Sequence, residues 1–289
     1  FHTVSAWNNA GFALFKDNLM DYADSLPVNI VISGLIIFGG IGYQTIVEFY
    51  LATRHRLLRQ PGRFLWSLNF KVVVSTTILL LVVGTVAIFL TEQRNHATIA
   101  DLDFGQQLMA AWFQSVTTRT AGFNTIDNGK MTIAGIFVTI GLMFIGASPS
   151  GTGGGIKTTT FGILASATRS ALQSKSTVVM FDRLVSTDLL IKAVAVVFGS
   201  AGVIVLATVA ISLGDSHFNA IQVLFEVVSA FATVGLSMGI TAQLSELNQL
   251  ILVAVMYTGR VGVLLLISAL IQVPKPSAVK YPTENLLVG

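Results

Sequence analysis

The stretch FQSVTTRTAGFNT at residues 113–125 has two relatives in the same chain, FHTVSAWNNAGFA at 1–13 and FEVVSAFATVGLS at 225–237. The copies begin at residues 1, 113 and 225, which is one constant spacing. All three share the pattern F-x-x-V-[ST]-[AT], followed by a short run that ends in a glycine. A fixed period of this kind indicates an internal repeat. The chain is therefore built from recurring units.

Composition places these units in a membrane. Hydrophobic residues make up 53% of the chain and charged residues only 11%, whereas ordinary globular proteins carry roughly 25% charged residues. The net charge is only +3 and the basic residues fall in particular loops, so nucleic acid is excluded as a partner and membrane lipid is favoured. The absence of cysteine leaves no disulfide pattern to interpret.

Five segments reach the roughly 20 apolar residues that a bilayer crossing needs. They lie at about 28–52, 71–91, 131–168 with a Gly-rich break inside, 189–213 and 246–272. The connection 52–71 carries five basic residues and no acidic ones, which predicts a cytoplasmic loop. Because successive loops lie on opposite sides of the membrane, the loop at 169–192 and the C-terminal tail are then also expected on the cytoplasmic side. The sequence predicts an all-α, multi-pass protein of the cell membrane.

Each repeat copy is too short to cross a bilayer and is followed by a long span. This order predicts a re-entrant pore helix, a glycine turn and a span. Irregular backbone at membrane depth is tolerated only where it is buried in protein or lines water. Glycine permits the backbone angles that aligned carbonyl groups need, and rings of carbonyls form cation filters. The alternative is an ordinary helix C-cap glycine, but three copies at one period favour the filter.

The chain is expected to begin inside the second of four such units, because three copies do not close a fourfold ring. The expected parts are the pore helix, filter and second span of unit two at 1–60, unit three at 61–175, unit four at 176–273 and a cytoplasmic tail at 274–289.

The motifs SAWNNAGF, TRTAGFNT, FEVVSAFATVGLS and SPSGTGGGIKTTTF, taken together, resemble the Trk/Ktr/HKT superfamily of potassium transporters, and within it the KtrB-type membrane subunit. The resemblance covers essentially the whole chain. It implies four units of span, pore helix and span in one polypeptide, one filter glycine per unit, and flux of K⁺ that can depend on Na⁺.

Carried onto this sequence, the resemblance implies that K⁺ binds at the carbonyls of Gly11, Gly122 and Gly235. The full set of implied filter residues is Asn9, Ala10, Gly11, Thr120, Ala121, Gly122, Thr233, Val234 and Gly235. The filter glycine of unit one is not in this chain. Transport of sodium or another monovalent cation by the same fold therefore stays open as an alternative.

The run GASPSGTGGGIKTTT at 146–160 interrupts an apolar span, and the resemblance implies an intramembrane gate loop at 146–157. The residues assigned to the gate are Ser148, Ser150, Gly151, Thr152, Gly153, Gly154, Gly155, Lys157 and Arg260. Glycines let the backbone swing, and broken helices form ion sites at mid-membrane. A nucleotide P-loop is excluded because isoleucine, not glycine, precedes the lysine and no strand leads into the run.

Arg260 is expected near the middle of the span 246–272, where an isolated charge costs at least about 2.5 kcal/mol. The resemblance implies that it faces the pore beside the gate loop, where hydrogen bonds to loop oxygens would hold the gate shut. Two roles for Lys157 stay open: it is either a gate residue or a lysine whose side chain reaches the inner membrane interface. Arg119 is expected to brace the pore loop.

The expected partners come from the resemblance alone: a second copy of the membrane subunit, and a soluble ring-forming regulatory subunit that binds ATP or ADP. The sequence disfavours two rival classes of protein. An enzyme or ATP-driven pump would need a cytosolic domain, and the inner loops are too short to hold one. A carrier with alternating access would show inverted repeats, whereas these repeats run in one orientation. The chain is therefore predicted not to be an enzyme.

Overall fold

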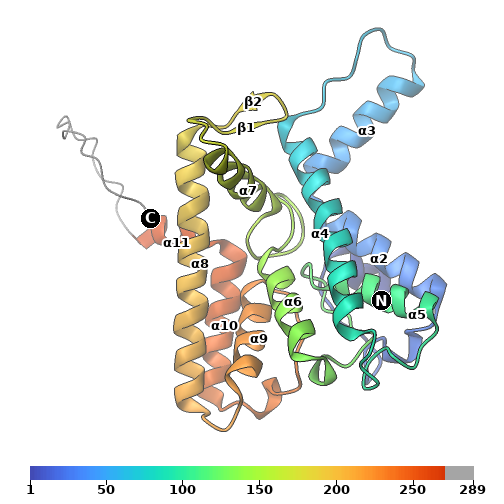
Figure 1. Cartoon of the computed structure of the whole chain (residues 1–289), viewed down its shortest axis with the longest axis vertical. Coiled ribbons are helices and arrows are strands. Elements are labelled where there is room, and N and C mark those ends of the chain that lie inside the picture. The colour runs from blue at the N-terminus through green and yellow to red at the C-terminus, as the bar shows by residue number, and fades with distance from the viewer. Residues whose placement is uncertain (271–289) are drawn as a thin grey trace, which may run out of the picture.

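Residues 1–270, the part of the chain that this computed structural model describes, form helices joined by loops and one short β-hairpin (Figure 1). Helices suit an apolar chain in lipid because their backbone groups bond internally. The α-helices are α1 (His2–Trp7), α2 (Leu26–Gly40), α3 (Tyr43–Leu57), α4 (Leu68–Glu92), α5 (Phe104–Thr117), α6 (Ile133–Phe144), α7 (Thr158–Leu172), α8 (Thr187–Gly214), α9 (Ala220–Phe231), α10 (Glu246–Val261) and α11 (Val263–Leu270). The predicted all-α membrane fold is confirmed. The tail expected at 274–289 lies outside the described residues.

The remaining elements are short. Three 3₁₀ turns follow the glycine turns, at Met20–Tyr22, Asn128–Lys130 and Thr241–Gln243. Strands β1 (Val179–Met180) and β2 (Arg183–Leu184) pair antiparallel in the connection from α7 to α8. This hairpin and α3 lie at the same end of the molecule (Figure 1). The connection 169–192 carries four basic and two acidic residues, so it and the connection 52–71 are the two basic connections of the chain. They share one end of the molecule, as their predicted common side requires.

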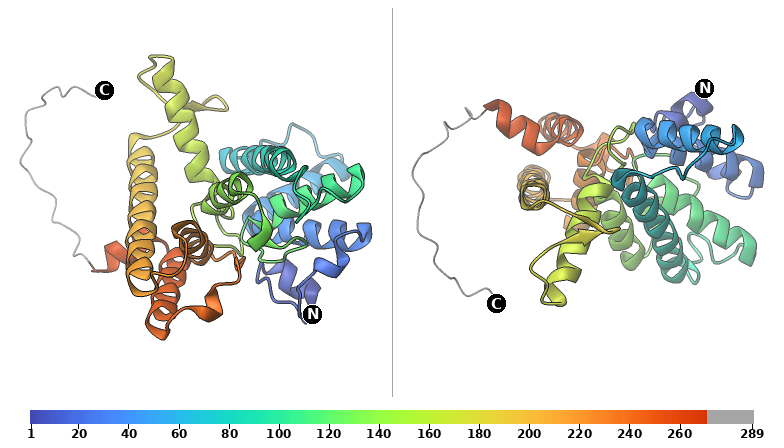
Figure 2. Two further views of the ribbon diagram at one scale, coloured as in Figure 1. Left: turned by 60° about the horizontal axis from the view of Figure 1, so that its bottom comes forward. Right: turned by 90° about the horizontal axis from the view of Figure 1, so that it is seen from above.

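Within residues 1–270, two helices, α4 and α8, are long and apolar enough to cross a bilayer by themselves, and the bent pair α2–α3 would be a third if counted as one span. Each of the two long helices begins a unit of the same plan. Helix α4 packs against α5 and α6, and α8 packs against α9 and α10 (Figure 2). The phenylalanine that opens the repeat is fully buried in both units, at Phe113 and Phe225.

A carboxylate at the end of each long helix holds the start of the second helix of its unit. Glu92 accepts hydrogen bonds from the backbone N–H of Thr132 (2.9 Å) and from its hydroxyl (2.6 Å), and Thr132 is the N-cap of α6. Asp215 accepts from the backbone N–H of Ser245, the N-cap of α10 (2.8 Å). The N-terminus of a helix is its positive end, so a carboxylate there is favourable. Neither carboxylate was singled out from the sequence.

Two predicted spans are not continuous, and these expectations were wrong. The segment expected at 28–52 is two helices that meet at an angle of 100°. The segment expected at 246–272 breaks between α10 and α11. Both breaks fall at a glycine in the left-handed region, Gly42 (φ 90°) and Gly262 (φ 94°). They end matching sequences, GGIG at 39–42 and GRVG at 259–262, which were a readable signal.

Candidate functional site

The three glycine turns share one backbone form. Gly11, Gly122 and Gly235 have φ values of 71°, 81° and 88°. The residue two positions before each glycine is also left-handed: Asn9 (50°), Thr120 (71°) and Thr233 (54°). A positive φ is costly for a residue that carries a Cβ atom. The repeat thus maintains an unfavourable conformation at the same two positions in every copy.

The three turns meet at one place, although they are far apart in sequence. A Cβ atom on Gly122 would lie 3.1 Å from the Cα of Gly11, 3.5 Å from the Cα of Gly235 and 2.5 Å from the carbonyl oxygen of Val234. A Cβ atom on Gly11 would lie 2.7 Å from the carbonyl oxygen of Ala121. Glycine is therefore required both by the backbone angle and by the lack of space.

The [ST] position of the repeat anchors the turn in two of the copies. The hydroxyl of Thr117 donates to the carbonyl of Phe123 (2.5 Å), and the hydroxyl of Ser229 donates to the carbonyl of Leu236 (2.6 Å). Each acceptor immediately follows the turn glycine. In the first copy the equivalent hydroxyl, on Ser5, is buried and has no hydrogen-bond partner among the described residues.

The Gly-rich run separates α6 from α7 and closes on itself. Ile145 and Ile156 form an isolated parallel bridge, and the N–H of Gly146 donates to the carbonyl of Ile156 (2.9 Å). The N–H of Ala147 donates to the carbonyl of Gly154 (3.2 Å). Residues 145–157 are therefore an ordered loop, which we call the α6–α7 loop.

This loop lies directly against two of the glycine turns. The N–H of Gly154 donates to the hydroxyl of Thr233 (3.0 Å). A Cβ atom on Gly153 would overlap the side chain of Thr120, and one on Gly154 would lie 2.9 Å from the methyl carbon of Thr233. The glycines predicted to give the loop freedom also give it the close approach to the turns.

The α2–α3 corner fixes the opposite edge of the loop. Three backbone hydrogen bonds join them: Ser148 N to Gly40 O (3.0 Å), Thr152 N to Gly39 O (3.2 Å) and Tyr43 N to Ser150 O (3.2 Å). Inside the loop Gly151 N donates to Ser148 O (3.1 Å), while Ser150 (φ 62°) and Gly155 (φ 71°) are left-handed. The loop therefore bridges the α2–α3 corner of unit two and the glycine turns of units three and four. That Gly39 and Gly40 would bind the loop was not predicted from the sequence.

Three cationic side chains each donate to a carbonyl of the α6–α7 loop. The pairs are Arg119 to Gly146 O (3.3 Å), Lys157 to Gly153 O (2.8 Å) and Arg260 to Thr152 O. Arg260 lies in the last turn of α10, two residues before the break at Gly262, and not at mid-helix as expected. The expected hydrogen bond between Arg260 and a loop oxygen is present. Lys157 turns back onto its own loop.

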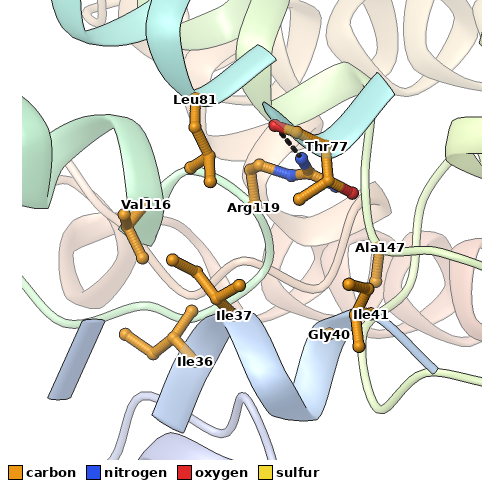
Figure 3. A pocket seen from close by; sticks show the side chains of 9 residues that line it. All are labelled: Ile36, Ile37, Gly40, Ile41, Thr77, Leu81, Val116, Arg119 and Ala147. Carbon is orange, nitrogen blue, oxygen red and sulfur yellow. Dashed lines mark hydrogen bonds between the residues drawn. The ribbon is translucent and has the colours of Figure 1, made fainter. Parts of the chain in front are cut away.

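Arg119 is almost fully buried, and Figure 3 shows its guanidinium among side chains of α2, α4 and α5. Besides its hydrogen bond to Gly146, the guanidinium donates a hydrogen bond to the carbonyl of Thr77 (3.4 Å). It lines a cavity of about 20 Å³, room for about one water molecule. Both bonds connect the turn of unit three to its surroundings, which fits the predicted bracing role.

A groove of about 510 Å³ runs beside the turns of units two and four. Asn9, Thr233, Thr152 and Arg260 line it, so it joins predicted filter and gate residues. Among the described residues, the one acidic side chain that lines it is that of Glu226, in α9. The Glu226 carboxylate accepts from the N–H of Met238 (2.9 Å) and from the hydroxyls of Ser237 (2.6 Å) and Thr241 (2.8 Å). It fixes the segment that follows the turn. Glu226 was missed, although a charge in an apolar helix was a visible signal.

Comparison with known proteins identifies the family of the chain. The TrkH family, described as cation transport protein, matches residues 1–281. The chain is 41% identical to Ktr system potassium uptake protein B of Vibrio alginolyticus and 36% identical to the protein of that name from Bacillus subtilis. It is 36% identical to potassium/sodium uptake protein NtpJ of Enterococcus hirae. Each match covers 100% of this chain, which spans 62–63% of the length of these relatives.

The fold is also that of a solved structure. The potassium transporter TrkH from Vibrio parahaemolyticus aligns with 93% of this chain at a TM-score of 0.74. The sequences are 17% identical over this match, which covers 57% of the solved chain. This likeness concerns the arrangement of the helices.

Proposed function

Because the chain belongs to the TrkH family of cation transport proteins, we propose that it forms the greater part of a potassium uptake protein in which the three glycine turns are part of the ion filter. The observation that carries this proposal is the meeting of Gly11, Gly122 and Gly235. The relatives named above are uptake proteins for potassium or for potassium and sodium, which points away from an enzyme.

The filter would use backbone oxygens in place of the water around the ion. The oxygens proposed to bind K⁺ belong to Asn9, Ala10, Gly11, Thr120, Ala121, Gly122, Thr233, Val234 and Gly235. Helices α5 and α9 end just before their turns, so the negative end of each helix dipole faces the bound cation. Sodium or another monovalent cation is the alternative cargo, with Na⁺ also a candidate activator.

The α6–α7 loop is the proposed gate. What supports this is its position against Thr120 and Thr233, together with the three cationic side chains bound to its carbonyls. In the closed arrangement Arg260 would keep Thr152 in place and repel cations that reach the loop. Moving the loop requires breaking hydrogen bonds to Gly39, Gly40 and Thr233, so opening is coupled to the α2–α3 corner and to the filter.

We also propose the setting in which the protein works. It would be a multi-pass protein of the cell membrane with a cytoplasmic C-terminus, paired with a second copy. A soluble nucleotide-binding ring subunit would bind its cytoplasmic face. The names of two relatives assign each of them to a Ktr system, which supports a partner subunit. The two basic connections share one end of the molecule, which supports a cytoplasmic face there.

Ion uptake by the full-length protein in cells that lack their own potassium uptake tests the filter. Gly122→Asp should abolish uptake of K⁺ and its dependence on Na⁺, because the new side chain would occupy the point where the turns meet. Gly141→Ala is the matched control, since a Cβ atom there meets nothing within 4 Å. Normal uptake by Gly122→Asp at normal expression would disprove the filter.

A separate flux measurement tests the gate. Arg260→Ala removes a hydrogen bond to Thr152 and a positive charge, so K⁺ flux at equal expression should rise. Arg169→Ala, on the exposed surface of α7, is the control and should leave flux unchanged. Unchanged or lower flux in Arg260→Ala would contradict gating by this residue while leaving the filter proposal intact.

A further inference from the structure

The connection between α3 and α4 forms a basic hairpin at one end of the molecule. Helix α3 turns through 100° away from α2, so it does not continue the direction of a bilayer crossing. Glu48 in α3 accepts hydrogen bonds from the N–H (2.5 Å) and hydroxyl (2.6 Å) of Ser67, the N-cap of α4. The one carboxylate of this hairpin is thereby engaged in closing it. Every other charge between α3 and α4 is an arginine.

The hairpin encloses a pocket of about 440 Å³. Arg56, Arg59 and Gln60 supply donors to it, and Phe64 and Trp66 supply its apolar wall. The aromatic rings form a connected row, with centroids 5.2 Å apart for Phe64 and Trp66 and 4.1 Å apart for Trp66 and Phe70. No acidic side chain lines this pocket in the described structure. Its charge therefore complements an anion.

The position of the pocket identifies the source of that anion. Trp66 lies two residues before α4, which is long and apolar enough to cross the bilayer. Tryptophan is typical of the membrane–water interface. Helix α3 and the connection that follows it, which carry the pocket residues, also expose the apolar side chains of Phe49, Leu57 and Leu65. A free inorganic anion would gain nothing from this apolar border, whereas a lipid places acyl chains there.

We propose that this pocket binds the phosphate headgroup of an anionic phospholipid. Arginine guanidinium groups bind phosphate oxygens in a two-pronged manner, and basic pockets beside membrane-spanning helices bind anionic headgroups. Arg56 and Arg59 bind the phosphate, Gln60 donates to the rest of the headgroup, and the acyl chains lie along the aromatic row. None of the residues that line the pocket belongs to a glycine turn or to the α6–α7 loop, and the proposal does not depend on the proposed transport.

Fluorescence of Trp66 reports binding directly. The full-length protein carries Trp7→Phe and Trp112→Phe, with any upstream tryptophan also replaced, and is placed in nanodiscs. Brominated phosphatidylglycerol or brominated phosphatidylcholine is then titrated as quencher. Phosphatidylglycerol should quench at lower mole fraction. Removing each arginine, by Arg56→Gln or Arg59→Gln, should weaken the preference about fivefold.

Two controls separate the pocket from general surface charge and from free phosphate. Arg169→Gln and Arg183→Gln change exposed arginines outside the pocket and should leave the preference intact. Inorganic phosphate at millimolar concentration should not relieve the quenching. Equal quenching by both lipids, or competition by inorganic phosphate, would overturn the proposal. So would arginine variants that keep the lipid preference but no longer retain a soluble partner protein, because the pocket would then bind protein.

Discussion

Units three and four follow the same plan until their second helices end, and there they differ. Each has a long helix, a carboxylate that holds the next helix, a buried phenylalanine, a short helix and a glycine turn. In unit four the second helix breaks at one glycine, Gly262. In unit three the break is a loop of residues 145–157 that reaches the turns of unit four and the corner of unit two. The shared plan builds the meeting point of the turns, and the difference supplies the proposed gate.

The largest expected effect contrasts the two turns. Gly122→Ala should reduce K⁺ uptake by the full-length protein at least about tenfold, because a Cβ there meets both neighbouring turns in a backbone region that costs about 1–2 kcal/mol. Gly235→Ala has the same backbone strain, but its Cβ would meet only the Cα of Gly122, at 3.7 Å. It should retain more uptake. Equal loss in both variants would show that backbone strain alone matters.

The two carboxylates offer the next contrast. Glu92 is fully buried and also accepts from Asn95 and Thr98 (2.8 Å each). Glu92→Gln places an amide donor against these donors and should lower the free energy of unfolding by about 3 kcal/mol. Asp215→Asn, at a half-buried site, should cost much less. Thermal unfolding in detergent measures both, and similar losses would refute the role of burial.

A smaller effect distinguishes the threonines under the loop. Thr233→Val removes the acceptor of the Gly154 N–H and should destabilise the loop by about 1 kcal/mol. Hydrogen exchange of residues 145–157 should then be several times faster, since 1.4 kcal/mol corresponds to about tenfold. Thr120→Val is the control because its hydroxyl has no partner among the described residues. Faster exchange in the control alone would contradict the assigned hydrogen bond.

The smallest expected effect is a pH dependence at Asp215. Hydrogen bonds from the Asn248 side chain and the Ser245 backbone lower the pKa of this carboxyl below its ordinary value of 3.8. A lowered pKa in the folded state stabilises the fold above the unfolded pKa, and this is lost as pH falls through the folded pKa. The difference in melting temperature between wild type and Asp215→Asn should therefore shrink below pH 3.8. A difference that grows there would reverse the assignment.

The glycine turns could be predicted because the sequence repeats them. The helix breaks and the long-range hydrogen bonds were not predicted from any such repeat. Gly11, Gly122 and Gly235 were identified because three copies share one period, and the α6–α7 loop because small residues interrupt an apolar segment. The breaks at Gly42 and Gly262 were missed because the glycines of GGIG and GRVG leave the mean hydropathy of the surrounding span high. The bonds from Glu92 and Asp215 to the next helix join residues 40 and 30 positions apart. Only tertiary packing brings such pairs together.

The cationic side chains on the α6–α7 loop have one more consequence. The carbonyls of Gly146, Thr152 and Gly153 already have an internal positive partner, so in the proposed gate a permeating ion would have to displace a tethered side chain to use them. The effective concentration of a tethered group is fixed by the fold, whereas that of a free ion changes with its surroundings. Under the proposed function, rising potassium would therefore loosen the loop, so that the cargo acts as its own agonist.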